Sequence, residues 1–160
     1  LALPDMRRLV VAHCCDLIAV TLGATRDATA VAQGRGVRAA RLRAIETDIE
    51  AHLPHGDLSP GTVANRQQVS ESYIRKLFGD EGTSFSEYVL TRRLVRARRM
   101  LTDARWAGIG IASIAYDAGF GDLSYFNRTF KRCYGATPSE MREMAKSMAK
   151  SGSDSVNPIT

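Results

Sequence analysis

Apolar residues recur at helical spacing through most of the chain, and the clearest case is a segment near residue 125. Four apolar residues fall at positions i, i+3, i+7 and i+11: Leu123, Phe126, Phe130 and Tyr134. This spacing places them in one stripe on a helix. Asp122 precedes the stripe and can cap the helix by accepting hydrogen bonds from its first free N–H groups. Ser124, Arg128 and Arg132 lie roughly opposite the stripe, which predicts a helix with one buried face and one short polar and cationic face.

A second copy of this pattern lies upstream, at residues 70–78. The segments 70–78 (SESYIRKLF) and 122–130 (DLSYFNRTF) share one order: cap, any residue, Ser, Tyr, apolar, polar, basic, any residue, Phe. Each copy follows a short segment that ends in an apolar residue and alanine, Val63-Ala64 or Ile114-Ala115. A repeated supersecondary unit in a chain of this size indicates two helix-turn-helix units. We predict their second helices over about 70–79 and 122–133.

Capping signals place three further helices around these units. Ser59-Pro60 predicts a helix start at the first unit, with proline at the first helical position. Ser84 and Glu87 form a capping box that opens a long helix to about Leu101, roughly 26 Å in length. Thr137 and Glu140 form another such box, and this last helix is expected to fade near Lys146.

The long helix is predicted to carry two different faces. Its buried stripe is Leu90, Leu94, Ala97 and Leu101. Its opposite face is a basic ridge, Arg92, Arg96 and Arg99, that lies between the two units. A solvated helix surface and a contact with DNA phosphates are both consistent with this ridge.

The N-terminal part has a different pattern. Residues 4–22 predict a helix that is apolar on more than one side, so we expect a further neighbour or a second copy to cover it. Residues 23–36 are small, polar and glycine-bearing, and predict a linker or loop. The next predicted helix, 37–53, places Ala40, Ile45, Ile49 and Leu53 inward.

Composition narrows the class of function. The chain has 160 residues, a net charge of +5 and a pI near 9.4, which fit a polyanionic partner. Its three cysteines show no metal-ligand or CxxC spacing, which favours a reducing, cytoplasmic compartment. No apolar run approaches the roughly 20 residues that span a bilayer. No nucleophile, metal or phosphate-loop motif is present, so we predict no enzyme, no cofactor and no metal site.

The repeat resembles the DNA-binding domain of AraC/XylS-type bacterial transcription regulators over roughly residues 41–144. The most specific stretch is 114–131 (IAYDAGFGDLSYFNRTFK), followed by 135–138 (GATP). The first half is similar through Ser70, Tyr73, Leu77-Phe78 and Arg93-Leu94. One departure is Gln67-Gln68, where the family's first turn usually carries an apolar residue and then glycine.

The resemblance implies an all-α fold with two helix-turn-helix subdomains joined by a long linker helix. We expect residues 1–40 to be the tail of an upstream effector or dimerisation domain plus a linker. The DNA-binding domain would follow at 41–146, and a mobile tail at 147–160. Implied partners are double-stranded DNA, RNA polymerase, and a second copy of the chain through residues 4–22 or the upstream domain. The alternative is an all-α protein-interaction module that uses the repeat only as scaffold.

The implied function is the reading of two successive major grooves, about 34 Å or 10 bp apart, at an asymmetric site. The predicted base-reading residues are Ser72, Arg75, Lys76, Ser124, Asn127 and Arg128. The predicted contacts to the DNA backbone are Ser70, Arg92, Arg96, Arg99, Lys131 and Arg132.

Overall fold

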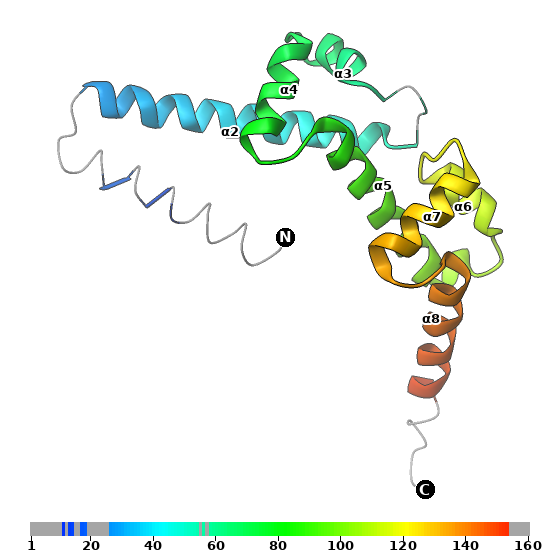
Figure 1. The fold of residues 1–160 in the computed structure, drawn as a ribbon. Helices are drawn as coiled ribbons and strands as arrows, with labels where there is room; N and C mark the ends of the chain where they lie inside the picture. Colours follow the sequence, from blue (N-terminus) through cyan, green and yellow to red (C-terminus); the bar gives the residue numbers. More distant parts are fainter. Residues whose placement is uncertain are drawn as a thin grey trace, which may run out of the picture. The chain divides into compact units, whose positions relative to one another are not determined.

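The computed structural model describes residues 26–54, 56 and 58–153, together with Val11, His13, Cys14, Leu17 and Ile18. Every regular element in these ranges is a helix, which confirms the all-α prediction (Figure 1). The chain divides into two compact parts, Leu1–Glu46 and Thr47–Thr160, and both helix-turn-helix units lie in the second part. Most of the predicted helix at 4–22 lies outside the described residues.

Helix α2 (Arg26–His52) begins much earlier than predicted and includes residues of both compact parts. The predicted loop at 23–36 is therefore wrong from Arg26 onward. Ala, Arg and Gln favour helix, and each of the two glycines opposes it by only about 1 kcal/mol. The inward position of Ala40 is also wrong, because Ala40 is exposed whereas Ile45, Ile49 and Leu53 are buried. Five residues separate Ala40 from Ile45, a rotation of about 500° that places the two on different sides of a helix.

The first helix-turn-helix subdomain consists of α3 (Pro60–Gln67) and α4 (Glu71–Asp80). Ser59 caps α3 as predicted, and its hydroxyl accepts a hydrogen bond from the Thr62 N–H. The buried side chains of this subdomain, with those at the end of α2, are Ile49, Leu53, Val63, Ala64, Ile74, Leu77 and Phe78. Phe78 also meets Phe85 edge-on, with ring centroids 5.7 Å apart, so the first subdomain packs on the start of the next helix.

Helix α5 (Phe85–Thr102) is the predicted linker between the two subdomains (Figure 1). The predicted capping box is confirmed, because the Ser84 N–H donates to the Glu87 carboxylate and the Glu87 N–H donates to the Ser84 hydroxyl. Leu94, Ala97 and Leu101 of the predicted stripe are buried, and Leu90 is half-buried. Helix α5 packs on α4 at one end, and on α6 and α8 towards the other.

The second subdomain consists of the short helix η1 (Ala104–Trp106), α6 (Ile111–Asp117), α7 (Leu123–Tyr134) and α8 (Pro138–Ser153). Its core contains a row of neighbouring rings, Phe120, Phe126, Phe130 and Tyr134, with successive centroids 4.9, 5.4 and 4.7 Å apart. Helix α8 runs to Ser153, beyond the end predicted near Lys146. Residues 154–160 of the predicted tail lie outside the described residues.

Candidate nucleic-acid interface

In the first unit, α4 exposes one polar face and buries the other. Ser70 caps the helix, and its hydroxyl accepts a hydrogen bond from the Tyr73 N–H. All three predicted base-reading residues of this helix are exposed: Ser72, Arg75 and Lys76. The opposite face packs into the core through Ile74, Leu77 and Phe78. The side chains of α4 are therefore buried or exposed as the amphipathic sequence pattern predicts.

The first turn is closed by Gln68 rather than by glycine. Gln68 adopts φ 54° and ψ 45°, a left-handed conformation that residues with a Cβ rarely take. The Val69 N–H donates to the Ala64 carbonyl at 3.0 Å, and in the second unit the Phe120 N–H donates to the Ala115 carbonyl at 2.9 Å. The first turn thus has the same backbone bond as the second, and the departure at Gln67-Gln68 leaves the turn intact at the cost of local strain.

The second unit repeats this arrangement on α7. Asp122 caps the helix by accepting a hydrogen bond from the Tyr125 N–H. Phe126 and Phe130 are buried, and the predicted base-reading residues are all exposed: Ser124, Asn127 and Arg128. The predicted bounds of both recognition helices, about 70–79 and 122–133, agree with α4 and α7 and their caps.

One variable position of the repeat is a core position in both copies, and in the second copy the sequence pattern did not reveal it. Leu77 and Thr129 occupy the same place in the two copies, immediately before the shared Phe. Their relative exposures are 1% and 4%. The threonine of the second copy concealed the burial there, because threonine is usually found at the surface.

The second turn is held in place by contacts distant in sequence. Gly119 has a positive φ of 95°, and a Cβ built on it would lie 2.1 Å from the Leu53 carbonyl oxygen and 2.6 Å from Arg93 Nε. Arg93 Nε in turn donates to the Leu53 carbonyl at 3.2 Å. Burial lowers the pKa of this arginine. Arg93 therefore helps to position the second turn against Leu53. The sequence indicated its importance only through its place in the family-like pattern.

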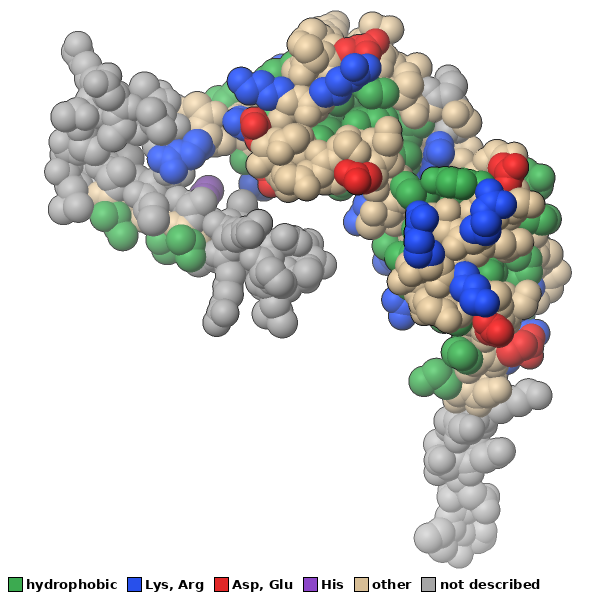
Figure 2. Space-filling view, viewed as in Figure 1, with side chains coloured by type: hydrophobic (Ala, Val, Ile, Leu, Met, Phe, Trp, Pro, Cys, Tyr) green, Lys and Arg blue, Asp and Glu red, His purple; other side chains and the backbone are tan. Residues whose placement is uncertain are grey.

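The charges on the two recognition helices differ. Helix α7 carries three basic residues and no acidic one: Arg128, Lys131 and Arg132. All three are exposed. Helix α4 carries Arg75 and Lys76 but also Glu71 and Asp80, and Arg75 pairs with Glu71 at 2.9 Å. Figure 2 shows Lys and Arg side chains gathered over the region of α7. The second unit is therefore the more cationic of the two.

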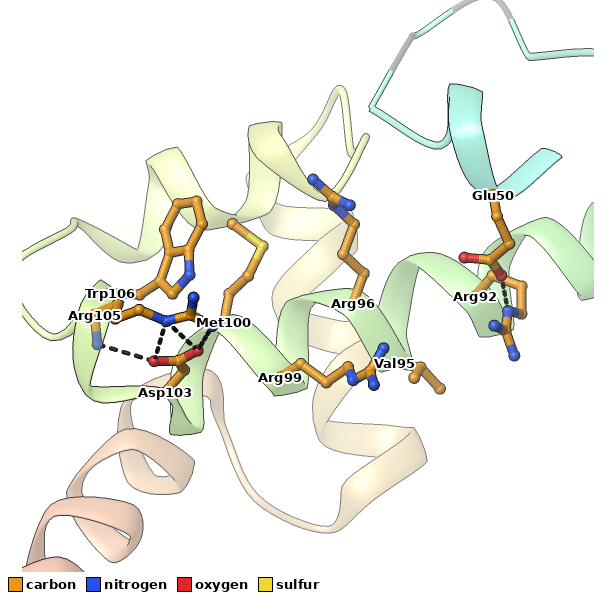
Figure 3. A pocket seen from close by; sticks show the side chains of 9 residues that line it. All are labelled: Glu50, Arg92, Val95, Arg96, Arg99, Met100, Asp103, Arg105 and Trp106. Carbon is orange, nitrogen blue, oxygen red and sulfur yellow. Dashed lines mark hydrogen bonds and ion pairs between the residues drawn. The ribbon is translucent and has the colours of Figure 1, made fainter. Parts of the chain in front are cut away.

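The basic ridge on α5 is partly engaged within the protein. Arg92 forms an ion pair with Glu50 at the end of α2, a contact that the sequence did not predict. Arg96 Nε donates to the Asp117 carbonyl oxygen at the end of α6, at 3.2 Å. Arg99 is exposed. The three arginines do share one face of α5, as predicted, and they line one pocket on it (Figure 3).

Carboxylates occupy the starts of two helices. The Ser84 hydrogen bonds, first that from the backbone N–H, lower the pKa of Glu87 below its usual value of 4.5. The Thr137 N–H likewise lowers the pKa of Glu140, which closes the predicted capping box of α8. Both carboxylates satisfy N–H groups that a helix start would otherwise leave open.

Metal-binding clusters and membrane-spanning helices are both absent from the described part of the chain. Among those residues, no group of three His, Cys, Asp or Glu side chains could hold a metal ion. No helix formed by them is long and apolar enough to cross a membrane.

Comparison with known proteins agrees with this geometry. The sequence profile of a helix-turn-helix domain family matches residues 63–144. The chain is 43% identical over 105 residues to the transcriptional activator RhrA of Rhizobium meliloti (strain 1021), an alignment that covers 66% of this chain and 33% of RhrA. It is 34% identical over 95 residues to the arabinose operon regulatory protein of Escherichia coli (strain K12), covering 59% and 32%. The chain thus spans about a third of the length of the curated relatives it matches.

The fold also has solved counterparts. The C-terminal domain of AraT, a response regulator from Geobacillus stearothermophilus, superimposes with a TM-score of 0.59 at 27% identity, covering 65% of this chain and 84% of that domain. A DNA-binding transcriptional dual regulator from Escherichia coli K-12 superimposes with the same TM-score and identity, covering 64% and 89%.

Two capped recognition helices joined by one linker helix define an all-α double helix-turn-helix DNA-binding domain, and not an enzyme. The chain belongs to the AraC/XylS family of transcription regulators. Sequence-specific DNA binding in transcription regulation is therefore its function class, and the protein-interaction alternative is not favoured.

Proposed function

We propose that one copy of this chain reads an asymmetric DNA site, with α4 and α7 in successive major grooves of one duplex. The observation that carries this proposal is the repeated polar face, exposed on both helices at equivalent positions. The two faces differ in sequence and charge, so the two halves of the site would differ as well. An α-helix fits the major groove, where each base pair has a distinct pattern of donors and acceptors.

The six base-reading residues divide by chemistry. Lys76 and Arg128 occupy the same place in the two copies and suit guanine, whereas Asn127 suits adenine. Ser72 and Ser124 are short and can donate or accept at either base. Arg75 is held by Glu71, so this ion pair opens before Arg75 reaches a base. We therefore assign the leading role in the first unit to Lys76 and in the second to Arg128.

Selection of bound sites from random duplex DNA tests these roles. Lys76→Ala and Arg128→Ala should each relax the sequence preference at one or two base pairs, at opposite ends of the site. The expected cost is about 1–3 kcal/mol at those positions. Lys146→Ala is the matched control, because Lys146 is a basic residue of α8 that pairs with Glu143 and belongs to neither recognition helix. A uniform loss of affinity across all sequences would assign Lys76 and Arg128 to phosphates instead.

The backbone contacts are proposed from position and charge. Ser70 lies at the N-terminus of α4, and Lys131 and Arg132 lie exposed in the last turn of α7. Arg92, Arg96 and Arg99 complete the set on the linker helix. Each phosphate neutralised by a protein cation contributes about 0.9 to the slope of log affinity against log salt. Arg96→Ala should lower this slope by up to that amount, and an unchanged slope would remove Arg96 from the set.

We further propose that the whole protein acts in the bacterial cytoplasm, contacts RNA polymerase and forms homodimers through residues 4–22 or an upstream domain. The relatives named above, regulators of transcription, support the polymerase contact. The exposed side chains of Val11, Leu17 and Ile18 support self-association. Sedimentation of the chain with and without residues 1–36 tests this dimer contact, and equal association of both would exclude it.

A further inference from the structure

A pocket of about 340 Å³ lies along the ridge face of α5 (Figure 3). Its walls come from α5, from η1 and from Glu50 at the end of α2. No residue of α4 or α7 lines it. The volume falls within the range of about 300–1,000 Å³ that small-molecule sites occupy. This pocket is therefore separate from the two proposed base-reading faces and large enough for a small ligand.

The charged residues in the pocket leave a surplus of positive charge. Four arginines and two carboxylates line it, which gives a net charge of +2 (4 − 2). Arg92 pairs with Glu50 at one end, and Arg105 pairs with Asp103 at the other. The hydrogen bonds from Arg105 lower the pKa of Asp103 to about 2, so this carboxyl stays ionised at neutral pH. The surplus therefore falls on Arg96 and Arg99, which lie between the two pairs (Figure 3).

These two arginines retain hydrogen-bond donors for a ligand. Arg96 uses Nε for the Asp117 carbonyl, and the structure gives its two terminal amino groups no partner among the described residues. The Arg99 guanidinium has no partner in the described part of the chain either. Positions 96 and 99 are i and i+3 neighbours on one helix face. Both arginines line the pocket, and each keeps donors that are suited to the oxygens of a phosphate.

The rest of the wall is apolar and includes a flat ring. Val95, Met100 and Trp106 line the pocket beside the charged residues. Trp106 packs on the core of the second subdomain while it remains half-buried. An indole held in this way can stack on a planar group of a ligand.

We propose that this pocket binds a small phosphorylated molecule that carries a planar ring, as a nucleoside monophosphate does. Its phosphate would bind Arg96 and Arg99, and its ring would pack against Trp106 and Met100. A phosphate monoester carries close to two negative charges at neutral pH, because its second pKa is about 6. The ligand charge thus matches the surplus of +2. Arg96 and Arg99 are also proposed above as contacts to DNA phosphates, so the small-molecule site is tested without DNA.

The protein provides its own reporter for the test, because Trp106 is the single tryptophan of the chain. Tryptophan fluorescence of the full chain is titrated with adenosine 5′-monophosphate at constant ionic strength, with adenosine and inorganic phosphate in parallel titrations. Excitation at the red edge of the tryptophan absorption limits absorption by the purine, and the adenosine titration corrects for what remains. We expect a saturable change with the monophosphate at concentrations at least about tenfold lower than with phosphate alone, and none with adenosine.

Variants locate the site. Arg99→Gln should lower the affinity for the monophosphate by at least about tenfold, because it removes a charge-assisted hydrogen bond. Arg98→Gln is the matched control: it makes the same change at the preceding residue, whose guanidinium lies over the Tyr134 ring and does not line the pocket. It should change the affinity by less than about twofold. Arg99 is exposed, so Arg99→Gln is expected to fold, and thermal unfolding without ligand checks this.

Three results would overturn the proposal. The first is the absence of a saturable fluorescence change with the monophosphate. The second is an equal loss of affinity in Arg99→Gln and Arg98→Gln, which would indicate binding by general charge. The third is equal binding of inorganic phosphate, which would leave the ring without a role. None of these results depends on DNA binding, so failure here and failure of the DNA-reading proposal are separate outcomes.

Discussion

Gly119→Ala is expected to destabilise the second subdomain far more than an ordinary change in a turn. Gly119 has φ 95°, and an added Cβ would lie 2.1 Å from the Leu53 carbonyl oxygen. Carbon and oxygen atoms in favourable contact are more than 1 Å further apart than this, so the turn and the end of α2 would have to separate. The new methyl group would also lie 2.6 Å from Arg93 Nε, which donates to that same carbonyl.

The magnitude follows from three contributions. An L-residue in the left-handed region costs about 1–2 kcal/mol. Replacing glycine by alanine recovers about 0.4–1 kcal/mol through the unfolded chain. Losing the hydrogen bond between Arg93 and Leu53 costs about 1.5–3 kcal/mol, the usual range for a bond with a charged donor. The net loss is about 1.5–4.5 kcal/mol, a large part of the stability of a small domain.

Two other glycines provide matched controls. Gly82 and Gly135 have φ 76° and 74°, and an added Cβ would meet no atom within 4 Å at either position. Gly82→Ala and Gly135→Ala should therefore cost only the backbone strain, about 1 kcal/mol net. Urea unfolding followed by circular dichroism measures all three variants. With an m-value of about 2 kcal/mol/M, the midpoint should fall by roughly 1–2 M for Gly119→Ala and by about 0.5 M for the controls. Equal shifts in the three variants would refute the close approach of the turn to Leu53 and Arg93.

Two further predictions concern the first turn and the helix caps. Gln68→Gly should raise the free energy of unfolding by about 0.5–1 kcal/mol, because glycine relieves the left-handed strain at φ 54°. The relief exceeds the conformational entropy that glycine adds to the unfolded chain. A decrease in the urea midpoint would contradict this. In the folded protein Glu87 and Glu140 have pKa values below the usual 4.5. Their contribution to the free energy of unfolding is therefore complete above pH 4.5 and is lost as the pH falls through the lower, folded pKa. The melting temperature should therefore fall on acidification below about pH 5, and it should fall less steeply in Glu87→Gln than in Glu81→Gln. Glu81→Gln is the control, because Glu81 is exposed and lies outside both capping boxes. Identical pH profiles of the two variants would refute the role of Glu87.

The sequence alone determined the local features of this protein. The capping residues Ser59, Ser70, Ser84 and Asp122 all begin helices where the pattern predicts them. The exposed faces of α4 and α7 were also predicted, because side chains three and four residues apart share a helix face whatever the surroundings. Bonds between neighbours in the chain and a periodic apolar stripe are properties of the segment itself, so no tertiary contact is needed to infer them.

The tertiary structure decided the contacts between residues distant in the chain. The pairing of Arg92 with Glu50, and the contact of Gly119 and Arg93 with the Leu53 carbonyl, join positions between 40 and 66 residues apart. No periodicity encodes such pairs, because they depend on how α2, α5 and α6 pack. The same packing buried Thr129, at the position where the first copy of the repeat has Leu77. It also gathered Trp106 and four arginines around one pocket, since only the folded chain places η1 beside the ridge face of α5.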